Sequence, residues 1–190
     1  MRILLHICCA NCAIYPVEML REEGHDVTGL FFNPNIHPYA EFVRRREALE
    51  KLAEEMQLRV IFLNSYPLEE FFRKVAFREA QRCRLCYQWR LETTSRVARR
   101  GKFQAFSTTL LFSKHQAHDL IREVGQAEAL GSSTDFLYRD FRVGWKQANV
   151  RSKEMGLYRQ TYCGCLYSQA ETQRVPRSGI LRRPKSPTVE

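Results

Sequence analysis

The sequence lacks a hydrophobic run long enough to cross a membrane. Hydrophobic residues make up 44% of its 190 residues, but no run approaches the roughly 18 apolar residues that a membrane helix needs. The first apolar run, after Met1, is about six residues long, shorter than the core of a secretory signal, and no small-residue cleavage site follows it. We therefore expect a cytoplasmic protein with no membrane partner.

Glycine is missing from the place where a phosphate-binding loop would need it. Cys8-Cys-Ala-Asn-Cys follows the first predicted strand, where nucleotide-binding enzymes carry a loop rich in glycine and serine. We therefore do not expect the chain to use ATP.

Strand-like and helical segments alternate four times. Strands are predicted at residues 2–7, 26–32, 58–63 and 103–108, and helices at residues 14–23, 40–56, 67–79 and 87–100. This order indicates an α/β fold with a mostly parallel, Rossmann-like sheet flanked by helices. Beyond Ser113 the pattern is mainly helical, with one candidate edge strand at residues 136–141.

The seven cysteines fall into three tight groups: Cys8-Cys9-x-x-Cys12, Cys83-x-x-Cys86 and Cys163-Gly-Cys165. In a reducing compartment such clusters indicate metal or redox chemistry, and an odd number cannot pair completely. Three polar or cysteine-bearing segments also follow predicted strands: Cys8-Cys9, Asn33-Pro-Asn and Ser107-Thr-Thr. Because ligands bind outside the carboxyl ends of parallel strands, we expect these segments to meet at one edge of the sheet.

The spacing leaves the chemistry of the cysteines open. Zinc could take four thiolates from the two Cys-x-x-Cys pairs, Cys9/Cys12 and Cys83/Cys86. That site would leave Cys8 and Cys163-Gly-Cys165 without a role. An iron–sulfur cluster also takes about four thiolates and can supply electrons. A disulfide within Cys163-Gly-Cys165 would close a strained ring of the labile, catalytic kind, and Gly164 gives it backbone freedom. Iron–sulfur is favoured, with zinc or a purely thiol-based redox site as alternatives.

The net charge of +9 and the pI of about 9.4 favour a polyanionic partner. Residues 73–100 hold nine Lys/Arg against two Glu and bracket Cys83-x-x-Cys86. We expect these arginines, among them Arg82 and Arg84, to contact a nucleic-acid backbone. The Arg44–Arg46 triplet is offset by nearby glutamates, which predicts a salt-bridged helix surface.

Four histidines have separate interpretations. His6 lies within a strand and is interpreted as a core histidine. His37 follows the second strand, and together with Asn33 and Asn35 it is a candidate substrate contact. His115 and His118 could bind a metal from one helix face, but a solvated face is the simpler interpretation.

Six motifs in this order resemble the QueH epoxyqueuosine reductases: Leu4-Leu-His-Ile-Cys-Cys-Ala-Asn-Cys, Phe31-Phe-Asn-Pro-Asn-Ile-His-Pro, Cys83-Arg-Leu-Cys-Tyr, Phe106-Ser-Thr-Thr-Leu, Asp140-Phe and Ser152-Lys-Glu-Met-Gly-Leu-Tyr-Arg-Gln-Thr-Tyr-Cys-Gly-Cys. The resemblance implies reduction of an epoxide on the wobble nucleoside of a tRNA to an alkene. This step takes two electrons and two protons, releases water, and here needs an electron donor that the sequence does not identify. The resemblance also implies a [4Fe-4S] cluster with a second iron beside it.

Site residues carried over by position are expectations of this resemblance. Cys8, Cys9, Cys83 and Cys86 would ligate the cluster, and Cys163 with Cys165 would form a redox-active disulfide. Some members carry aspartate at the position of Cys12, so Cys12 could ligate the adjacent iron, or alternatively replace Cys8 at the cluster. Asp140 or Tyr158 could donate a proton to the departing water.

The expected organisation is a single α/β metal-binding reductase domain, of the HUP or PP-loop-like kind, over residues 1–170. A basic, disordered tail is expected over residues 171–190. Two alternatives remain: a non-catalytic zinc module that binds nucleic acid, and a PP-loop-like tRNA-modifying enzyme of other chemistry.

Overall fold

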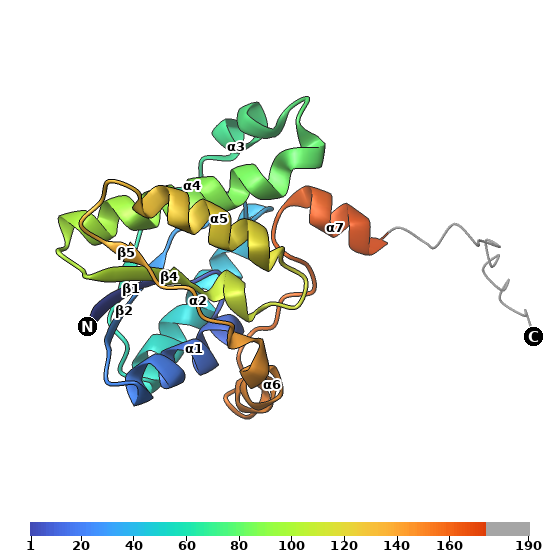
Figure 1. Cartoon of the computed structure of the whole chain (residues 1–190). Coiled ribbons are helices and arrows are strands. Elements are labelled where there is room, and N and C mark those ends of the chain that lie inside the picture. Colours follow the sequence, from blue (N-terminus) through green and yellow to red (C-terminus); the bar gives the residue numbers. More distant parts are fainter. Residues whose placement is uncertain (174–190) are drawn as a thin grey trace, which may run out of the picture.

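Five parallel strands form one sheet in the computed structural model, which describes residues 1–173 (Figure 1). The strands are β1 Arg2–His6, β2 Asp26–Phe31, β3 Val60–Phe62, β4 Ala105–Thr108 and β5 Asp135–Phe136. Their order is β3-β2-β1-β4-β5, and every neighbouring pair is parallel. The predicted α/β class with a parallel sheet is therefore confirmed.

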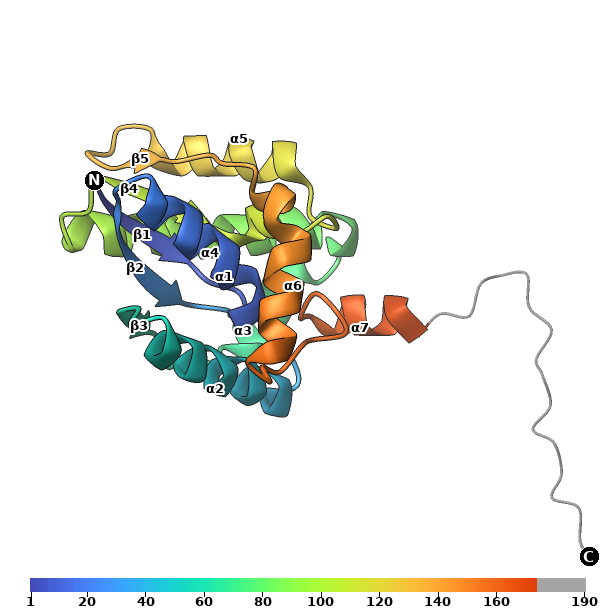
Figure 2. The same cartoon turned by 90° about the horizontal axis from the view of Figure 1, so that it is seen from below.

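Helices cover both faces of the sheet. They are α1 Ala10–Glu22, α2 Tyr39–Glu55, α3 Leu68–Val75, α4 Arg82–Arg100, α5 His118–Ala129, α6 Trp145–Glu154 and α7 Leu166–Gln173. Helices α1, α2 and α6 lie on one side, and α4 and α5 lie on the other (Figures 1 and 2). Parallel strands need such crossover helices, because the chain must return to the same end of the sheet before the next strand can run in the same direction.

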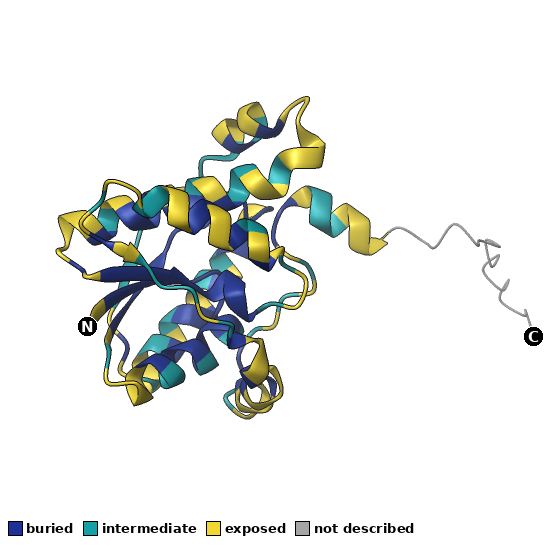
Figure 3. Ribbon diagram, in the orientation of Figure 1, coloured by how far each residue is buried: buried dark blue, intermediate teal, exposed yellow. Residues whose placement is uncertain are grey.

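The central strand explains why the core forms where it does. Residues 3–6 of β1 are wholly buried, and most of β2 and all of β4 are buried as well (Figure 3). A strand covered by helices on both faces reads as a continuous apolar run rather than an alternating one. His6 completes this run, and its ring bonds the Thr108 hydroxyl at 2.8 Å and the Phe32 carbonyl at 3.1 Å. Its interpretation as a core histidine is confirmed.

Several boundaries differ from the prediction. Helix α1 begins at Ala10, so Cys12 is already helical, and α4 begins at Arg82, so Cys83 and Cys86 lie inside the helix. Neither helix has a side-chain cap, so the usual sequence mark of a helix start is missing. His115 precedes α5 rather than sharing a helix face with His118.

The C-terminal half also departs from the prediction. The strand expected at residues 136–141 is reduced to β5, because the Asp140 side chain caps a short 3-10 helix, Phe141–Gly144 (η3), by accepting from the Arg142 amide. Helix α7 takes up residues 171–173 of the predicted tail, and the rest of the tail lies outside the described residues. None of the helices in residues 1–173 is long and apolar enough to span a membrane.

Gly144 allows η3 and α6 to pack against α1. A Cβ built on Gly144 would lie 2.0 Å from the Tyr15 ring, closer than any real contact. The Gly144→Ala variant should therefore lose about 1–3 kcal/mol of unfolding free energy, because the ring or the backbone must shift. Urea unfolding measures this loss. Val143→Ala, at a neighbouring exposed side chain, should stay within about 0.5 kcal/mol of wild type. Equal losses in both variants would contradict the packing argument.

Candidate metal and redox site

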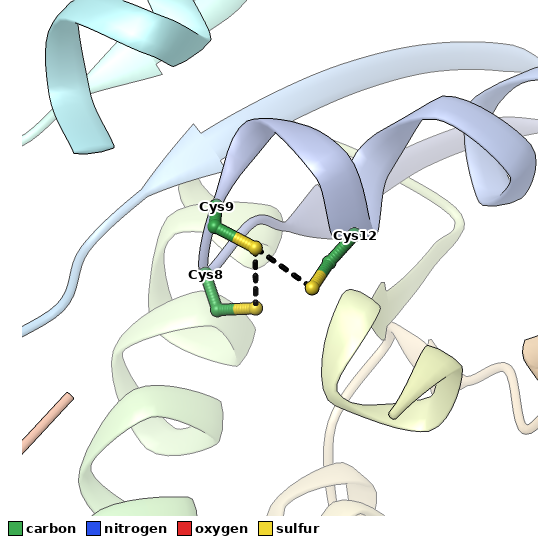
Figure 4. A group of neighbouring side chains, drawn as sticks. All are labelled: Cys8, Cys9 and Cys12. Atoms are coloured by element: carbon green, nitrogen blue, oxygen red, sulfur yellow. Dashed lines mark hydrogen bonds between the residues drawn. The ribbon is translucent and has the colours of Figure 1, made fainter. Parts of the chain in front are cut away.

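Three cysteine thiols gather where β1 gives way to α1. Cys9 is the N-cap of α1 in an extended conformation, and Cys12 follows one helical turn later. The Sγ atoms of Cys8 and Cys9 lie 3.8 Å apart, and those of Cys9 and Cys12 lie 2.7 Å apart. All three sulfur atoms lie within 4.8 Å of one another, and Figure 4 shows them facing a common point. We call these residues the thiol triad; it offers three soft ligands to one metal ion.

The triad is buried, and its thiols are not equivalent. Burial raises the pKa of Cys9, whereas hydrogen bonds from Cys12 and Cys9 hold the pKa of Cys8 well below its usual range. The Thr109 hydroxyl donates to the Cys8 sulfur at 3.3 Å. Cys8 is therefore the thiol of the three that is best prepared to be a thiolate, which is the form that binds metals.

A cavity of about 830 Å³ opens beside the triad. It is lined by cysteines of all three sequence groups: Cys8, Cys12, Cys83, Cys86, Cys163 and Cys165. Segments separated by about 70 residues or more in the sequence therefore face one space. The second group lies in the first turns of α4, where a spacing of three places both thiols on one helix face. Burial raises the pKa of Cys86 to about 12, and the nearby charge of Arg90 opposes that rise.

The Cys163-Gly-Cys165 segment forms the third wall of the cavity. Cys163 is exposed and its sulfur accepts from the Gln116 amide at 3.3 Å, whereas Cys165 is buried against Phe71 and Val75. Gly164 has a φ of 151°, a conformation that favours glycine. Both cysteines are free thiols in the structure.

A buried ion pair holds this segment against the sheet domain. Arg45 is 1% exposed and donates to Glu41 at 2.7 Å, to the Cys163 carbonyl at 2.8 Å and to the Tyr162 carbonyl at 2.9 Å. Glu41 also accepts from the Tyr158 hydroxyl at 2.5 Å. The prediction that the Arg44–Arg46 triplet forms only a helix surface is thus wrong for Arg45. It is right for Arg46, which pairs with Glu50.

In the described part of the chain, four of the nine cations of residues 73–100 form ion pairs. Ion pairs join Arg73 to Glu69, Lys74 to Glu70, Arg82 to Glu171 and Arg84 to Glu123. Arg82 borders the cavity, and Arg84 does not. Arg90 is not a surface residue at all, because it is 1% exposed and lines the cavity. Its guanidinium donates to the Asn35 side chain.

The predicted substrate-contact residues of the loop after β2 have different places in the structure. Asn35 lines the cavity, whereas the Asn33 amide donates to the Ile7 carbonyl at 2.9 Å and supports the end of β1. The His37 ring is buried among Tyr66, Phe71 and Phe72 and does not line the cavity.

The two candidate proton donors lie away from the cavity lining. Hydrogen bonds from Arg142 lower the pKa of Asp140 to about 2, so its carboxyl is ionised at neutral pH. The Tyr158 hydroxyl is engaged by Glu41, and burial raises its pKa. The structure brings neither group to the thiols.

Comparison with protein families adds a second line of evidence to this geometry. The model described as epoxyqueuosine reductase QueH matches residues 3–171. The chain belongs to the QueH epoxyqueuosine reductase family. The name of this family, epoxyqueuosine reductase, describes an oxidoreductase. A QueH of Dehalococcoides mccartyi is 39% identical over 93% of this chain and 97% of its own, and one of Thermotoga maritima is 35% identical over 95% and 96%.

A solved structure shares the fold alone. It is described as a predicted subunit of tRNA methyltransferase from Methanocaldococcus jannaschii. The two folds superpose with a TM-score of 0.52 at 9% identity, over 81% of this chain and 76% of that one. The likeness shows that this QueH family member shares the α/β fold of that chain.

Sequence reasoning missed three residues of the site. Arg45 and Arg90 were read as surface charges, although Arg90 follows Cys86 by four residues and so had to share its helix face. The third is Gln160, whose amide donates to the Cys9 sulfur at 2.8 Å. Only its place in the last resemblance motif could have marked it, since glutamine has no distinctive spacing.

Arg45 provides a test of the buried anchor. Arg45→Met should lower the unfolding free energy by about 3–5 kcal/mol, because it leaves Glu41 buried without its cation. Arg46→Met removes an exposed pair on the same helix and should cost less than about 1 kcal/mol. Chemical denaturation of both variants gives the comparison. Equal, small losses would show that Arg45 is not an anchor.

His37 makes stability depend on pH. Burial lowers its pKa to about 4, although the nearby Pro34 carbonyl opposes the shift, and neither ring nitrogen has a hydrogen bond of ordinary geometry. As the pH falls below the ordinary pKa of about 6.5, the unfolded chain therefore binds the proton first. The contribution of His37 is complete above that pH and is lost down to about pH 4.

The His37→Phe variant should consequently show a flatter loss of stability over this range. The difference in slope should reach up to about 1.4 kcal/mol per pH unit, measured by urea unfolding at several pH values. His115→Gln, at an exposed histidine, is the control and should retain the wild-type slope. A His37→Phe slope equal to that of wild type would refute the assignment.

Proposed function

We propose that this chain is an epoxyqueuosine reductase that acts on tRNA in the cytoplasm. The observation that carries the proposal is the meeting of six cysteines, from three distant segments, around one cavity in a member of the QueH family. Reduction of an epoxide to an alkene requires two electrons and two protons and releases water, so the site must supply both.

The donor set fits an iron–sulfur cluster. Cys8, Cys9, Cys83 and Cys86, the positions that the family resemblance implies, would hold a [4Fe-4S] cluster, which takes about four thiolates. Cys12 completes the thiol triad and would hold an adjacent iron. When bound, these groups would supply single electrons and a Lewis acid for the epoxide oxygen.

The last cysteine group would supply the reducing equivalents, and the residues around it would hold it in place. Oxidation of Cys163 and Cys165 to a disulfide releases two electrons and two protons, the stoichiometry of the reduction. Gly164 has no side chain to restrict the backbone between the two thiols, and Arg45 holds their segment at the cavity. An external donor, of a kind that remains to be identified, would then reduce the disulfide for the next turnover.

Anaerobic purification tests the proposal directly. About four or five irons per chain, with visible absorbance, are expected. Turnover of epoxyqueuosine-containing tRNA with a chemical reductant should then yield queuosine. One zinc per chain, no visible band and no turnover would instead identify a zinc module and overturn the proposal.

Cys83 and Cys163 should respond differently to substitution. Cys83→Ala should lose both the visible chromophore and turnover, because it removes a cluster ligand. Cys163→Ala is the matched control: it should keep the iron content and lose turnover, because it removes only the dithiol. Iron analysis, absorbance and nucleoside analysis of the product tRNA measure the two effects. A Cys83→Ala protein with full iron content and activity would contradict its role as a ligand.

A further inference from the structure

Arg90 is a buried cation without a buried anion to match it. It is 1% exposed, and the Nε atom of its guanidinium is buried without a hydrogen-bond partner. Among the ion pairs within residues 1–173, none involves Arg90. Its side-chain partner is the neutral oxygen of Asn35. A buried charge is costly unless it is paired, so this arrangement implies an anion that completes the site.

The position of Arg90 on α4 indicates which anion that is. Cys83, Cys86 and Arg90 follow one another at spacings of three and four, so they share one face of the helix, and all three line the cavity. The guanidinium is also close enough to the sulfur atoms of Cys8 and Cys86 to act on both electrostatically. The guanidinium is therefore near thiols of both groups, at the wall of the cavity that they share.

We propose that Arg90 is the counter-charge of the thiolate metal site and tunes both its metal affinity and its reduction potential. A divalent metal with three or four thiolates carries a net charge of minus one or minus two, which the guanidinium stabilises in a partly desolvated cavity. Adding an electron makes the site more negative, so the same cation makes reduction easier. Asn35 holds the guanidinium in place without neutralising it.

This inference rests on the proposed metal site, but cobalt can test it without an iron–sulfur cluster. Titration of the metal-free protein with Co²⁺ reports thiolate binding through the sulfur-to-cobalt charge-transfer band. Arg90→Gln should weaken Co²⁺ binding by about tenfold or more, because it removes the cation from a site of low effective dielectric. Arg90→Lys keeps the charge and should lose less.

Two further variants separate charge from packing. Asn35→Asp leaves Arg90 in place but gives it a carboxylate, so it should weaken Co²⁺ binding in the same direction. Arg99→Gln removes the same formal charge from an exposed site on α4. That site lies about 20 Å along the helix from Cys86, at 1.5 Å per residue, which is beyond the screening length of about 8–10 Å. It should bind Co²⁺ as the wild type does.

In protein that carries the cluster, a redox titration followed by electron paramagnetic resonance gives the second readout. The midpoint potential should fall in Arg90→Gln and in Asn35→Asp and should stay unchanged in Arg99→Gln. Wild-type Co²⁺ affinity and wild-type potential in folded Arg90→Gln and Asn35→Asp would overturn the inference. If Arg90→Gln fails to fold, Asn35→Asp and Arg90→Lys decide.

The same experiment separates this inference from the proposed function. A wild-type chain that binds Co²⁺ through thiolates but assembles no iron–sulfur cluster would refute the proposed cofactor and still test Arg90. A wild-type chain with no charge-transfer band would overturn the metal site and this inference together. Loss of tRNA affinity in Arg90→Gln, with unchanged Co²⁺ affinity, would instead assign Arg90 to a substrate phosphate and overturn the role proposed here.

Discussion

The guanidinium of Arg45 joins the last cysteine group to the rest of the molecule. It bonds the backbone carbonyls of Tyr162 and Cys163 from within α2, and it is itself fixed by Glu41. The amide of His37 adds a bond of 2.8 Å to the Gly164 carbonyl. A segment more than 100 residues away in the sequence is thereby held at the carboxyl edge of the sheet. These contacts add to the packing of Cys165 against Phe71 and Val75 and fix the place of both cysteines relative to the other thiols.

The fold and the edge that carries the site follow from rules that act locally. Apolar runs separated by amphipathic helices specify a parallel sheet, and the carboxyl ends of its strands must share one edge. The first cysteine group and Asn35 were therefore predicted at the right edge from their positions after β1 and β2. Cys83 and Cys86 also lie at this edge, but they lie in the first turns of helix α4 and do not follow a strand. Here the sequence predicted an adjacent helix, but the exact helix start was hidden by the lack of a capping side chain.

Burial of charged side chains could not be predicted in the same way. An arginine and a glutamate four residues apart have the same spacing whether the pair is partly exposed, as for Arg46 and Glu50, or buried, as for Arg45 and Glu41. The two pairs differ because residues 158–165 pack over Arg45 and Glu41, and this tertiary contact cannot be read from the spacing. A count of charge over residues 73–100 hides pairing in the same way: four of the nine cations meet glutamates on the same or another helix. The cation with the clearest place in the site is Arg90, which a count of charge treats as one among nine.

The thiol triad occupies the position that a phosphate would take in a related fold. The first amides of a helix carry a partial positive charge, so the turn between the first strand and its helix attracts anions. Here that turn has no glycine with which to wrap a phosphate; it has Cys9 at the N-cap of α1 and Cys12 in its first turn. A thiolate is also an anion, and the helix end, the Thr109 hydroxyl and Arg90 all favour the charged form of Cys8. The turn thus offers to sulfur the partial positive charge that a glycine-rich turn in this position offers to phosphate, and its cysteines suit a soft metal ion better than a nucleotide.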